Sequence, residues 1–151
     1  MYPNKAKLKV RKEQYVLAEL QRLVPELAAF TYVWDCPVPG GCSLKAPDLL
    51  YKLSDRYLQL EVDEGSHADR ACVDEDARLE IIAADVDLPG LVLRLDPDNP
   101  PCFRYRLLNN CERAVEAIQR NFRALMGCTA QMVREYLEGP PPTEVERRFV
   151  V

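Results

Sequence analysis

The segment 45–67, KAPDLLYKLSDRYLQLEVDEGSH, constrains the fold most strongly because apolar and polar residues alternate along its second half with the period of a β-strand. Two acids of this half, Glu61 and Asp63, fall on one face of the predicted strand. Three apolar residues fall on the other face, where we expect a hydrophobic core: Leu58, Leu60 and Val62. The pattern predicts a strand that packs on a core through one face and carries acids on the other.

A turn at Ser54 and Asp55 would make this segment a β-hairpin. In that register Asp48 lies directly opposite Glu61. Like charges that face each other across a sheet are unfavourable, and clustered carboxylates are commonly stabilised by a hard cation such as Mg²⁺. The hairpin therefore predicts a cation site between these two acids.

The overall composition is typical of a single globular domain. The chain has 151 residues, of which 48% are hydrophobic and 29% charged, so it can bury a core without covalent staples. Its first residues, MYPNKAKLKVRKEQY, contain no apolar signal region, and no apolar run is long enough to cross a membrane. We expect an intracellular protein, neither secreted nor membrane-bound, whose 6 cysteines are mostly reduced.

Charge is distributed unevenly along the chain. Residues 1–47 carry 7 basic and 4 acidic side chains, residues 48–98 carry 5 and 14, and residues 99–151 carry 8 and 6. The acidic middle surrounds the predicted hairpin, while both flanks are basic and the net charge is −4. A protein that holds a metal at its centre and phosphate at its edges would show this pattern, and so would one with a solvated acidic helix.

Hydrophobic periodicity predicts the remaining elements. Helices are expected over 10–24, 69–84, 107–127 and 129–138, and strands over 30–35 and 91–95. Pro25 interrupts or restarts the first helix, and Gly127 ends the third. The apolar side of the second helix is expected to carry Cys72, Ala77, Ile81 and Ala84. This order of elements predicts a mixed sheet with helices packed on it.

We expect one domain over 1–139, which includes a basic arm over 1–12, and a Pro-rich tail over 140–151. The arm is interpreted as a frayed terminus or as a DNA-contacting segment, and the last nine residues as a mobile tail or a segment docked on a partner. The arginines of the long helix form either a solvated face or a phosphate-binding stripe. They are Arg113, Arg120 and Arg123, with Arg104 and Arg106 just before them.

PD at 47–48, followed after twelve residues by EVD at 61–63, resembles the PD-(D/E)xK nuclease motif, with aspartate in place of the usual lysine. The predicted order of elements is similar to that superfamily's αβββαβ core. Four blocks, GGCSLKAPDLLYKL, LQLEVDEGSH, DEDAR and LRLDPD, also resemble the GGCSxRRPD, EVDExxH, ExxR and IRFNPD patterns of short nuclease-like proteins from giant DNA viruses and algae. That group in turn resembles the branch of the very-short-patch-repair endonucleases. The likeness covers residues 40–100 and the order of elements outside them.

The resemblance implies an α/β, restriction-endonuclease-like mixed sheet flanked by helices, with extra C-terminal helices, and a metal-dependent DNA endonuclease activity. Phosphodiester hydrolysis needs a divalent ion that neutralises charge on the phosphate and lowers the pKa of the attacking water. By this analogy, Asp48, Glu61 and the Val62 carbonyl bind Mg²⁺ or Mn²⁺. Asp63, where a lysine is expected, would bind a second metal or accept the proton of the water.

His67 is the only histidine of the chain. Within the EVDExxH block it is expected to protonate the leaving 3′ oxygen or contact the scissile phosphate, and without that resemblance it would be an incidental surface residue. Arg78, Arg94 and Lys45 are the candidate contacts to substrate phosphate, although the two arginines can equally balance the acidic cluster. The sequence departs from the family pattern at three positions, Ala46, Ser66 and Asp96. Each departure removes a polar or positive contact near the expected path of the substrate.

Several alternatives stay open at this point. The acids at 74–76 are interpreted as solvated, with a link to the site as the alternative. Cys36, Cys42 and Cys72, together with His67, form the weaker option of a structural Zn²⁺ site. The alternative function is a catalytically inactive nuclease-fold module that binds DNA or a protein partner. RNA as the substrate and a homodimer are further options, and a viral origin would place the protein in the host cytoplasm or nucleus.

Overall fold

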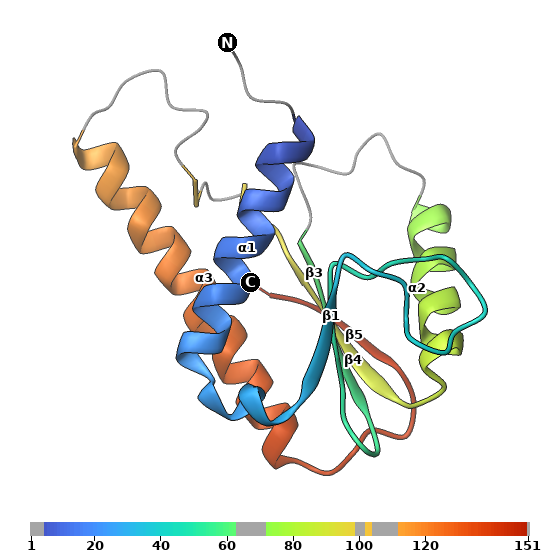
Figure 1. The fold of residues 1–151 in the computed structure, drawn as a ribbon. Helices are drawn as coiled ribbons and strands as arrows, with labels where there is room; N and C mark the ends of the chain where they lie inside the picture. The colour runs from blue at the N-terminus through green and yellow to red at the C-terminus, as the bar shows by residue number, and fades with distance from the viewer. Residues whose placement is uncertain (1–4, 63–71, 99–101, 104–111, 151) are drawn as a thin grey trace.

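The computed structural model describes residues 5–62, 72–98, 102–103 and 112–150, with the backbone alone for 5–11, 72–73 and 112 (Figure 1). The helical elements are α1 (Lys5–Leu23), the 3₁₀ turn η1 (Pro25–Ala29), α2 (Cys72–Val86) and α3 (Glu112–Glu138). The strands are β1 (Thr31–Trp34), β2 (Leu49–Lys52), β3 (Tyr57–Val62), β4 (Gly90–Leu95) and β5 (Glu146–Phe149). Pro25 is the first residue of η1, which begins two residues after the end of α1. Of the two effects predicted for this proline, it therefore restarts a helical turn.

The described strands form one mixed sheet in the order β1-β2-β3-β4-β5. β1, β2 and β3 are antiparallel neighbours, whereas β3 pairs with β4, and β4 with β5, in parallel. Parallel neighbours need a crossover connection, and α2 and α3 provide the two crossovers. The predicted α/β class is confirmed, and so are the mixed sheet, its flanking helices and the αβββαβ order.

The hairpin has the predicted register. Leu49 pairs with Leu60, and Lys52 pairs with Tyr57. The N–H of Leu53 donates to the Arg56 carbonyl over 2.8 Å, so the turn lies between these two residues, where it was predicted.

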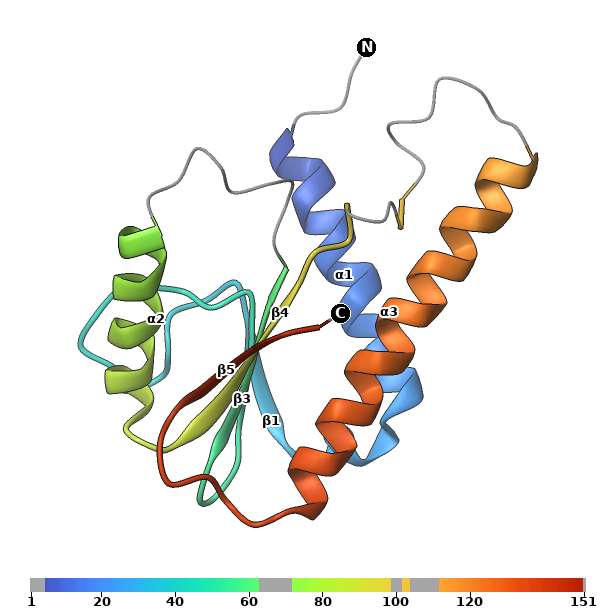
Figure 2. The same ribbon diagram turned by 180° about the vertical axis from the view of Figure 1, so that it is seen from behind.

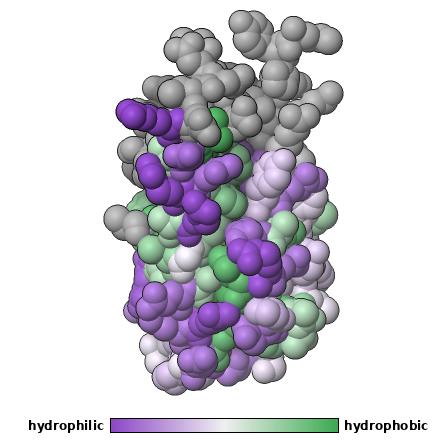
Figure 3. All heavy atoms as spheres, turned by 90° about the vertical axis from the view of Figure 1, so that its left-hand side faces the viewer, coloured by the Kyte–Doolittle hydropathy of each residue, from purple (hydrophilic) through white to green (hydrophobic). Residues whose placement is uncertain are grey.

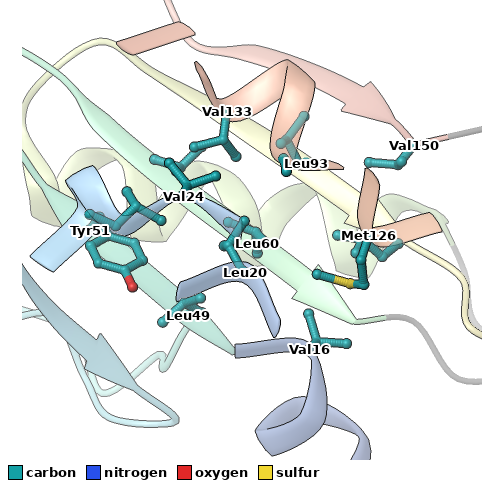
Figure 4. Packing of buried hydrophobic residues seen from close by; sticks show 14 of the residues in the cluster. Val16, Leu20, Val24, Leu49, Tyr51, Leu60, Leu93, Met126, Val133 and Val150 are labelled. Atoms are coloured by element: carbon teal, nitrogen blue, oxygen red, sulfur yellow. The ribbon is translucent and has the colours of Figure 1, made fainter. Parts of the chain in front are cut away.

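Helices cover both faces of the sheet (Figure 1 and Figure 2). α1 and α3 lie on one face and α2 on the other. The larger apolar cluster lies under α1 and α3, where Leu20 and Met126 meet Leu60 and Leu93 of the sheet (Figure 4). The smaller cluster lies under α2, and it consists of Val38, Leu50, Tyr57, Leu79, Ile82, Val86 and Val92. The face predicted to be apolar in β3 belongs entirely to the larger cluster, which confirms the predicted alternation.

The last helical region is one helix rather than the two that were predicted. α3 passes through Gly127 without a break. Met126, Ala130 and Val133 are buried on both sides of this position and recur at helical spacing. Their burial outweighs the cost of one glycine in a helix, which is about 1 kcal/mol relative to alanine. The predicted helix end was wrong because tertiary packing overrides local propensity here.

The segment 140–150 belongs to the domain, whereas a Pro-rich tail, mobile or docked on a partner over its last nine residues, was predicted. Its residues Glu146–Phe149 form β5, which pairs with β4 along its length. Val150 lies in the larger cluster, and its N–H donates to the Arg94 carbonyl over 2.9 Å. The charged side chains of this segment suit an edge strand, because such a strand is paired on one side and exposed on the other.

Most of the predicted basic arm over 1–12 is also folded, because α1 begins at Lys5. The Lys12 residue is 2% exposed, and its Nζ lies 2.9 Å from Asp98 Oδ1. Burial of an unpaired ammonium group would be costly, so this ion pair allows Lys12 to be buried. Lys12 therefore belongs to the core of the domain and not to a frayed or DNA-contacting end.

The side of α2 that packs on the sheet is not the side that was predicted. Its buried residues are Leu79, Ile82 and Val86, whereas Ile81 is 38% exposed. The predicted side consisted mainly of small residues, but large aliphatic side chains remove more apolar area from water and so determine the packed side. Cys72, also predicted on that side, has a side chain outside the described residues.

The surface on the α3 side of the molecule mixes hydrophilic and hydrophobic residues (Figure 3). Arg113, Arg120 and Arg123 of α3 are exposed, which fits both of their predicted roles, and 104–111 lie outside the described residues. In the part of the chain that the structure describes, no helix combines the length and the apolar character needed to cross a membrane.

Candidate metal and phosphate site

Two acids from neighbouring strands meet at one end of the sheet. Asp48 directly precedes β2, and Glu61 lies near the end of β3. Because Leu49 pairs with Leu60, Asp48 and Glu61 are the next facing positions of the hairpin. Both are buried, with 5% and 2% of their surfaces exposed. The structure thus brings together the two acids that were predicted to face each other.

The two carboxyl groups are hydrogen-bonded to each other, and the N–H of Val62 also donates to Asp48 Oδ2 over 2.8 Å. A carboxyl group must keep its proton to donate such a bond. Burial, followed by the negative charge of Asp48, raises the pKa of Glu61 from 4.5 to about 8. The raised pKa favours the protonated form of Glu61, and a divalent cation bound there would displace that proton.

Arg78 of α2 supplies a positive charge to this pair. Its Nη1 donates to Glu61 Oε1 over 3.2 Å and its Nη2 to Oε2 over 3.4 Å. The same guanidinium donates to Glu75 Oε1 over 3.1 Å and to the Ala46 carbonyl over 2.6 Å. Burial alone would lower the pKa of Arg78, but the charge of Glu61 and its hydrogen bond, aided by Glu75, raise it. In this geometry Arg78 balances the acidic cluster, and Glu75 is linked to the site through it.

Gln59 is a site residue that the sequence prediction missed. It is fully buried, and its Nε2 donates to Glu61 Oε1 over 2.6 Å. Its Oε1 has no hydrogen-bond partner among the described residues. The signal was available, because the alternation that places Glu61 away from the larger cluster also places Gln59, two residues earlier, on the same face.

Arg94 and Lys45, the other two predicted contacts to phosphate, lie at different places relative to the acid pair. Arg94 of β4 is the register partner of Glu61, so the two side chains leave the sheet on the same face. Lys45 is exposed in the loop before Asp48, and its backbone N–H donates to Ser43 Oγ over 3.3 Å. Arg94 therefore lies beside the acid pair, whereas Lys45 is a loop residue with a solvent-exposed side chain.

The GGCS block is anchored on α2. Asp85 Oδ1 accepts the N–H of Cys42 over 3.0 Å and that of Ser43 over 3.4 Å, and Ser43 Oγ donates to Oδ2. These hydrogen bonds lower the pKa of Asp85, and the bond from the Ser43 hydroxyl has the largest effect. Gly41 is needed beside them because a Cβ there would lie 2.8 Å from the Asp85 side chain. The block thus fixes the start of the segment that leads to Asp48.

Asp63 and His67 lie outside the described residues, so their roles stay predictions. The zinc site is equally untested, because Cys36 and Cys42 are exposed free thiols but the side chain of Cys72 is not described. Within the described ranges, no group of three or more His, Cys, Asp or Glu residues could hold a metal ion.

The two acids nevertheless suit a hard divalent cation that takes further ligands elsewhere. Mg²⁺ is commonly bound through one or two carboxylates while it keeps several waters. Asp48 and Glu61 provide two buried carboxyl groups in contact, whose mutual repulsion is relieved by a proton. These two residues would hold the cation, and its charge would take over the role of that proton.

Comparison with family models, with curated proteins and with solved structures finds no match to this chain. Since one fold can host many functions, function has to be inferred from the chemistry of the site. The site offers a buried carboxyl pair, an arginine that balances it and a second arginine beside it.

Proposed function

We propose that this protein is a Mg²⁺- or Mn²⁺-dependent DNA endonuclease in which Asp48 and Glu61 bind the metal. The observation that carries the proposal is the buried, hydrogen-bonded pair of these acids. Two carboxyl groups buried side by side are destabilising unless a proton or a cation relieves their mutual repulsion, so their presence favours a metal site. The αβββαβ order, with one acid before β2 and the other in β3, supports a restriction-endonuclease-like fold as part of the same proposal.

The residues of the chain divide the chemistry between them. A bound divalent ion supplies charge neutralisation at the phosphate and a lower pKa for the attacking water. Asp48 is oriented by the Val62 N–H, and Glu61 is held by Gln59 and Arg78, so both acids are positioned before any metal binds. Arg94 lies next to Glu61 and would contact the phosphate of the substrate. Asp63 and His67 would then assist water activation and departure of the 3′ oxygen.

Cleavage by matched variants tests the proposal. Supercoiled plasmid and branched synthetic DNA would be incubated with the wild type, with Glu61→Gln and with Glu80→Gln in Mg²⁺ or Mn²⁺. Glu80 is an exposed acid of α2, so its variant makes the same change of charge away from the site. We expect cleavage by the wild type and by Glu80→Gln, and a loss of about 100-fold or more in Glu61→Gln. If the wild type cuts no DNA in either metal, or Glu61→Gln cuts equally well, the proposal is wrong.

One observation favours a second function, a catalytically silent nuclease-fold module that binds DNA or a protein. Arg78 and Gln59 already donate hydrogen bonds to Glu61, so the Arg78 guanidinium provides part of the charge balance that a metal would provide. Under this alternative, calorimetric titration of Mn²⁺ into the wild type gives no binding heat, while DNA binding with a steep salt dependence persists. Metal binding that Glu61→Gln abolishes would exclude it.

A further inference from the structure

The C-terminal strand β5 places an aromatic ring in line with the acid pair. Glu61 of β3 pairs in register with Arg94 of β4, and Arg94 pairs with Phe149 of β5. Register partners in a sheet point to the same face, so these three side chains form a row across three strands. The row runs from the proposed metal ligand to the edge of the sheet.

The second and third members of this row are in contact. The guanidinium carbon of Arg94 lies 5.1 Å from the centroid of the Phe149 ring, which is within the range of a cation–π interaction. The backbone fixes the same pair, because the N–H of Val150 donates to the Arg94 carbonyl over 2.9 Å. Phe149 is 67% exposed, so burial in the core does not account for an aromatic residue here.

An aromatic ring under a guanidinium restricts the orientations that the guanidinium can adopt. Where the guanidinium lies flat over the ring, its N–H donors point outward in its own plane, where phosphate oxygens are bound in a forked geometry. The opposite side of β5 offers a contrast, because Arg148 is exposed there and bonds to Glu146 of its own strand. Of these two arginines, Arg94 is the one that lies next to Glu61.

We infer that Phe149 is a positioning residue, which holds the Arg94 guanidinium beside Glu61 so that Arg94 binds a phosphate oxygen of the DNA. The inference rests on the proposed endonuclease function and extends it, because it makes β5 a part of the substrate site. Phe149 itself touches Arg94 and not the reacting atoms. Its contribution should therefore depend on its aromatic ring and on the presence of Arg94.

The test is steady-state cleavage by the full chain with Phe149→Leu, Phe149→Tyr, Phe149→Trp and Arg94→Gln. Phe149→Leu keeps an apolar side chain but removes the ring, so KM for DNA is expected to rise about two- to fivefold with little change in kcat. The two aromatic variants should behave as the wild type. Arg94→Gln should raise KM about tenfold or more, since it removes charge-assisted hydrogen bonds to phosphate. Arg148→Gln, the loss of an arginine from the other face of β5, serves as the matched control and should leave KM unchanged.

The double variant Arg94→Gln/Phe149→Leu separates positioning from a merely structural role. If Phe149 acts through Arg94, then Phe149→Leu has no further effect once Arg94 is gone. An equal effect of Phe149→Leu in both backgrounds, or none in the wild-type background, overturns the inference while the proposed function stands.

DNA affinity measured with the same variants at several salt concentrations decides the case if the wild type fails to cleave. Weaker binding in Arg94→Gln and in Phe149→Leu, with wild-type binding in Phe149→Trp, would support the role of Phe149 although the proposed chemistry had failed. No DNA binding by the wild type, or binding that Phe149→Leu leaves unchanged, would overturn the inference.

Discussion

The two faces of the sheet are packed in different ways. The face under α1 and α3 is covered by one extended apolar cluster (Figure 4). The face under α2 has a smaller apolar cluster, and beside it lie the buried polar residues Gln59 and Glu61 with the guanidinium of Arg78. Two buried side-chain atoms lack a hydrogen-bond partner among the described residues, Tyr57 Oη and Gln59 Oε1, and both residues belong to this second face.

Adjacent residues of β3 serve stability on one face of the sheet and the candidate site on the other. Leu60 and Glu61 are adjacent in β3, yet Leu60 belongs to the apolar cluster and Glu61 to the acid pair on the opposite face. Buried polar groups reduce stability unless all of them are paired, so we expect them where function requires them. The α1/α3 face should therefore determine the free energy of unfolding, and the α2 face the response to metal and pH.

Leu60→Ala should have the largest effect on stability. Truncation of a fully buried leucine lowers the free energy of unfolding by about 2–5 kcal/mol, since it removes buried apolar area and leaves a cavity. Urea denaturation measures this change. Leu44→Ala is the matched control, because Leu44 is 90% exposed, and it should change stability by about 0.5 kcal/mol at most. Equal effects of the two substitutions would show that the large cluster does not dominate stability.

Arg78→Gln should lower the stability of the metal-free protein by about 1–3 kcal/mol. It removes the charge that balances Glu61 and leaves the Ala46 carbonyl without this donor. Under the proposed function, Mn²⁺ should restore part of the loss, and the rise in melting temperature on addition of Mn²⁺ should be larger than in the wild type. Arg22→Gln, which removes an arginine from an exposed pair on α1, is the control and should not change the response to metal. A smaller metal response in Arg78→Gln than in the wild type would contradict the idea that arginine and metal compete.

The free energy of unfolding should depend on pH through the protonation of Glu61. Because the pKa of Glu61 is raised in the fold from 4.5 to about 8, the folded state binds more protons than the unfolded state between these values. The stability linked to the protonated form is full below pH 4.5 and is lost as the pH rises toward about 8. The slope is at most about 1.4 kcal/mol per pH unit. Denaturation across this window should show the decline in the wild type and its absence in Glu61→Gln.

Metal addition should reverse this decline. A divalent cation replaces the proton of the pair, so the stabilisation by Mn²⁺ should increase from pH 6 to pH 8 in the wild type. Thermal melts with and without Mn²⁺ at each pH measure the effect. Stabilisation that is independent of pH, or that persists in Glu61→Gln, would place the metal elsewhere.

Glycine substitutions should change stability with opposite signs on the two faces, and Gly127→Ala should give the smallest effect. Gly127→Ala should stabilise the protein by about 0.5–1 kcal/mol, because position 127 lies inside α3 and an added Cβ meets nothing within 4 Å. Gly90→Ala should destabilise it by about 1–3 kcal/mol, because a Cβ there would come within 2.4 Å of the Tyr57 ring. Destabilisation by Gly127→Ala, measured in the same denaturation experiment, would mean that α3 ends at this glycine after all.

The hairpin and its acids could be predicted from sequence because their signals are local. The period-two alternation sets which face each residue of β3 occupies, and a short turn fixes the register that brings Asp48 opposite Glu61. The partners of the acids could not be predicted in the same way. Arg78 reaches the pair because α2 packs on this face of the sheet, and the side of α2 that is packed was predicted wrongly.

The C-terminal half shows the same limit. Gly127 and the three prolines from 140 to 142 are strong local signals for a helix end and a loose tail, yet α3 continues through the glycine and β5 follows the prolines. Met126 and Val133 hold the helix against the sheet, and pairing with β4 orders the last strand. Both outcomes depend on surfaces supplied by other parts of the chain.

The sequence by itself determined the mixed α/β architecture, the hairpin register and the facing pair of acids, since each follows from periodicity or turn geometry within a short stretch. The tertiary structure alone decided that Glu61 is bonded by Gln59 and Arg78, that Lys12 is buried against Asp98, and that the Arg94 guanidinium lies over the Phe149 ring. The physical reason is that burial, charge pairing and stacking depend on which elements pack together, and the residues involved are mostly far apart in sequence.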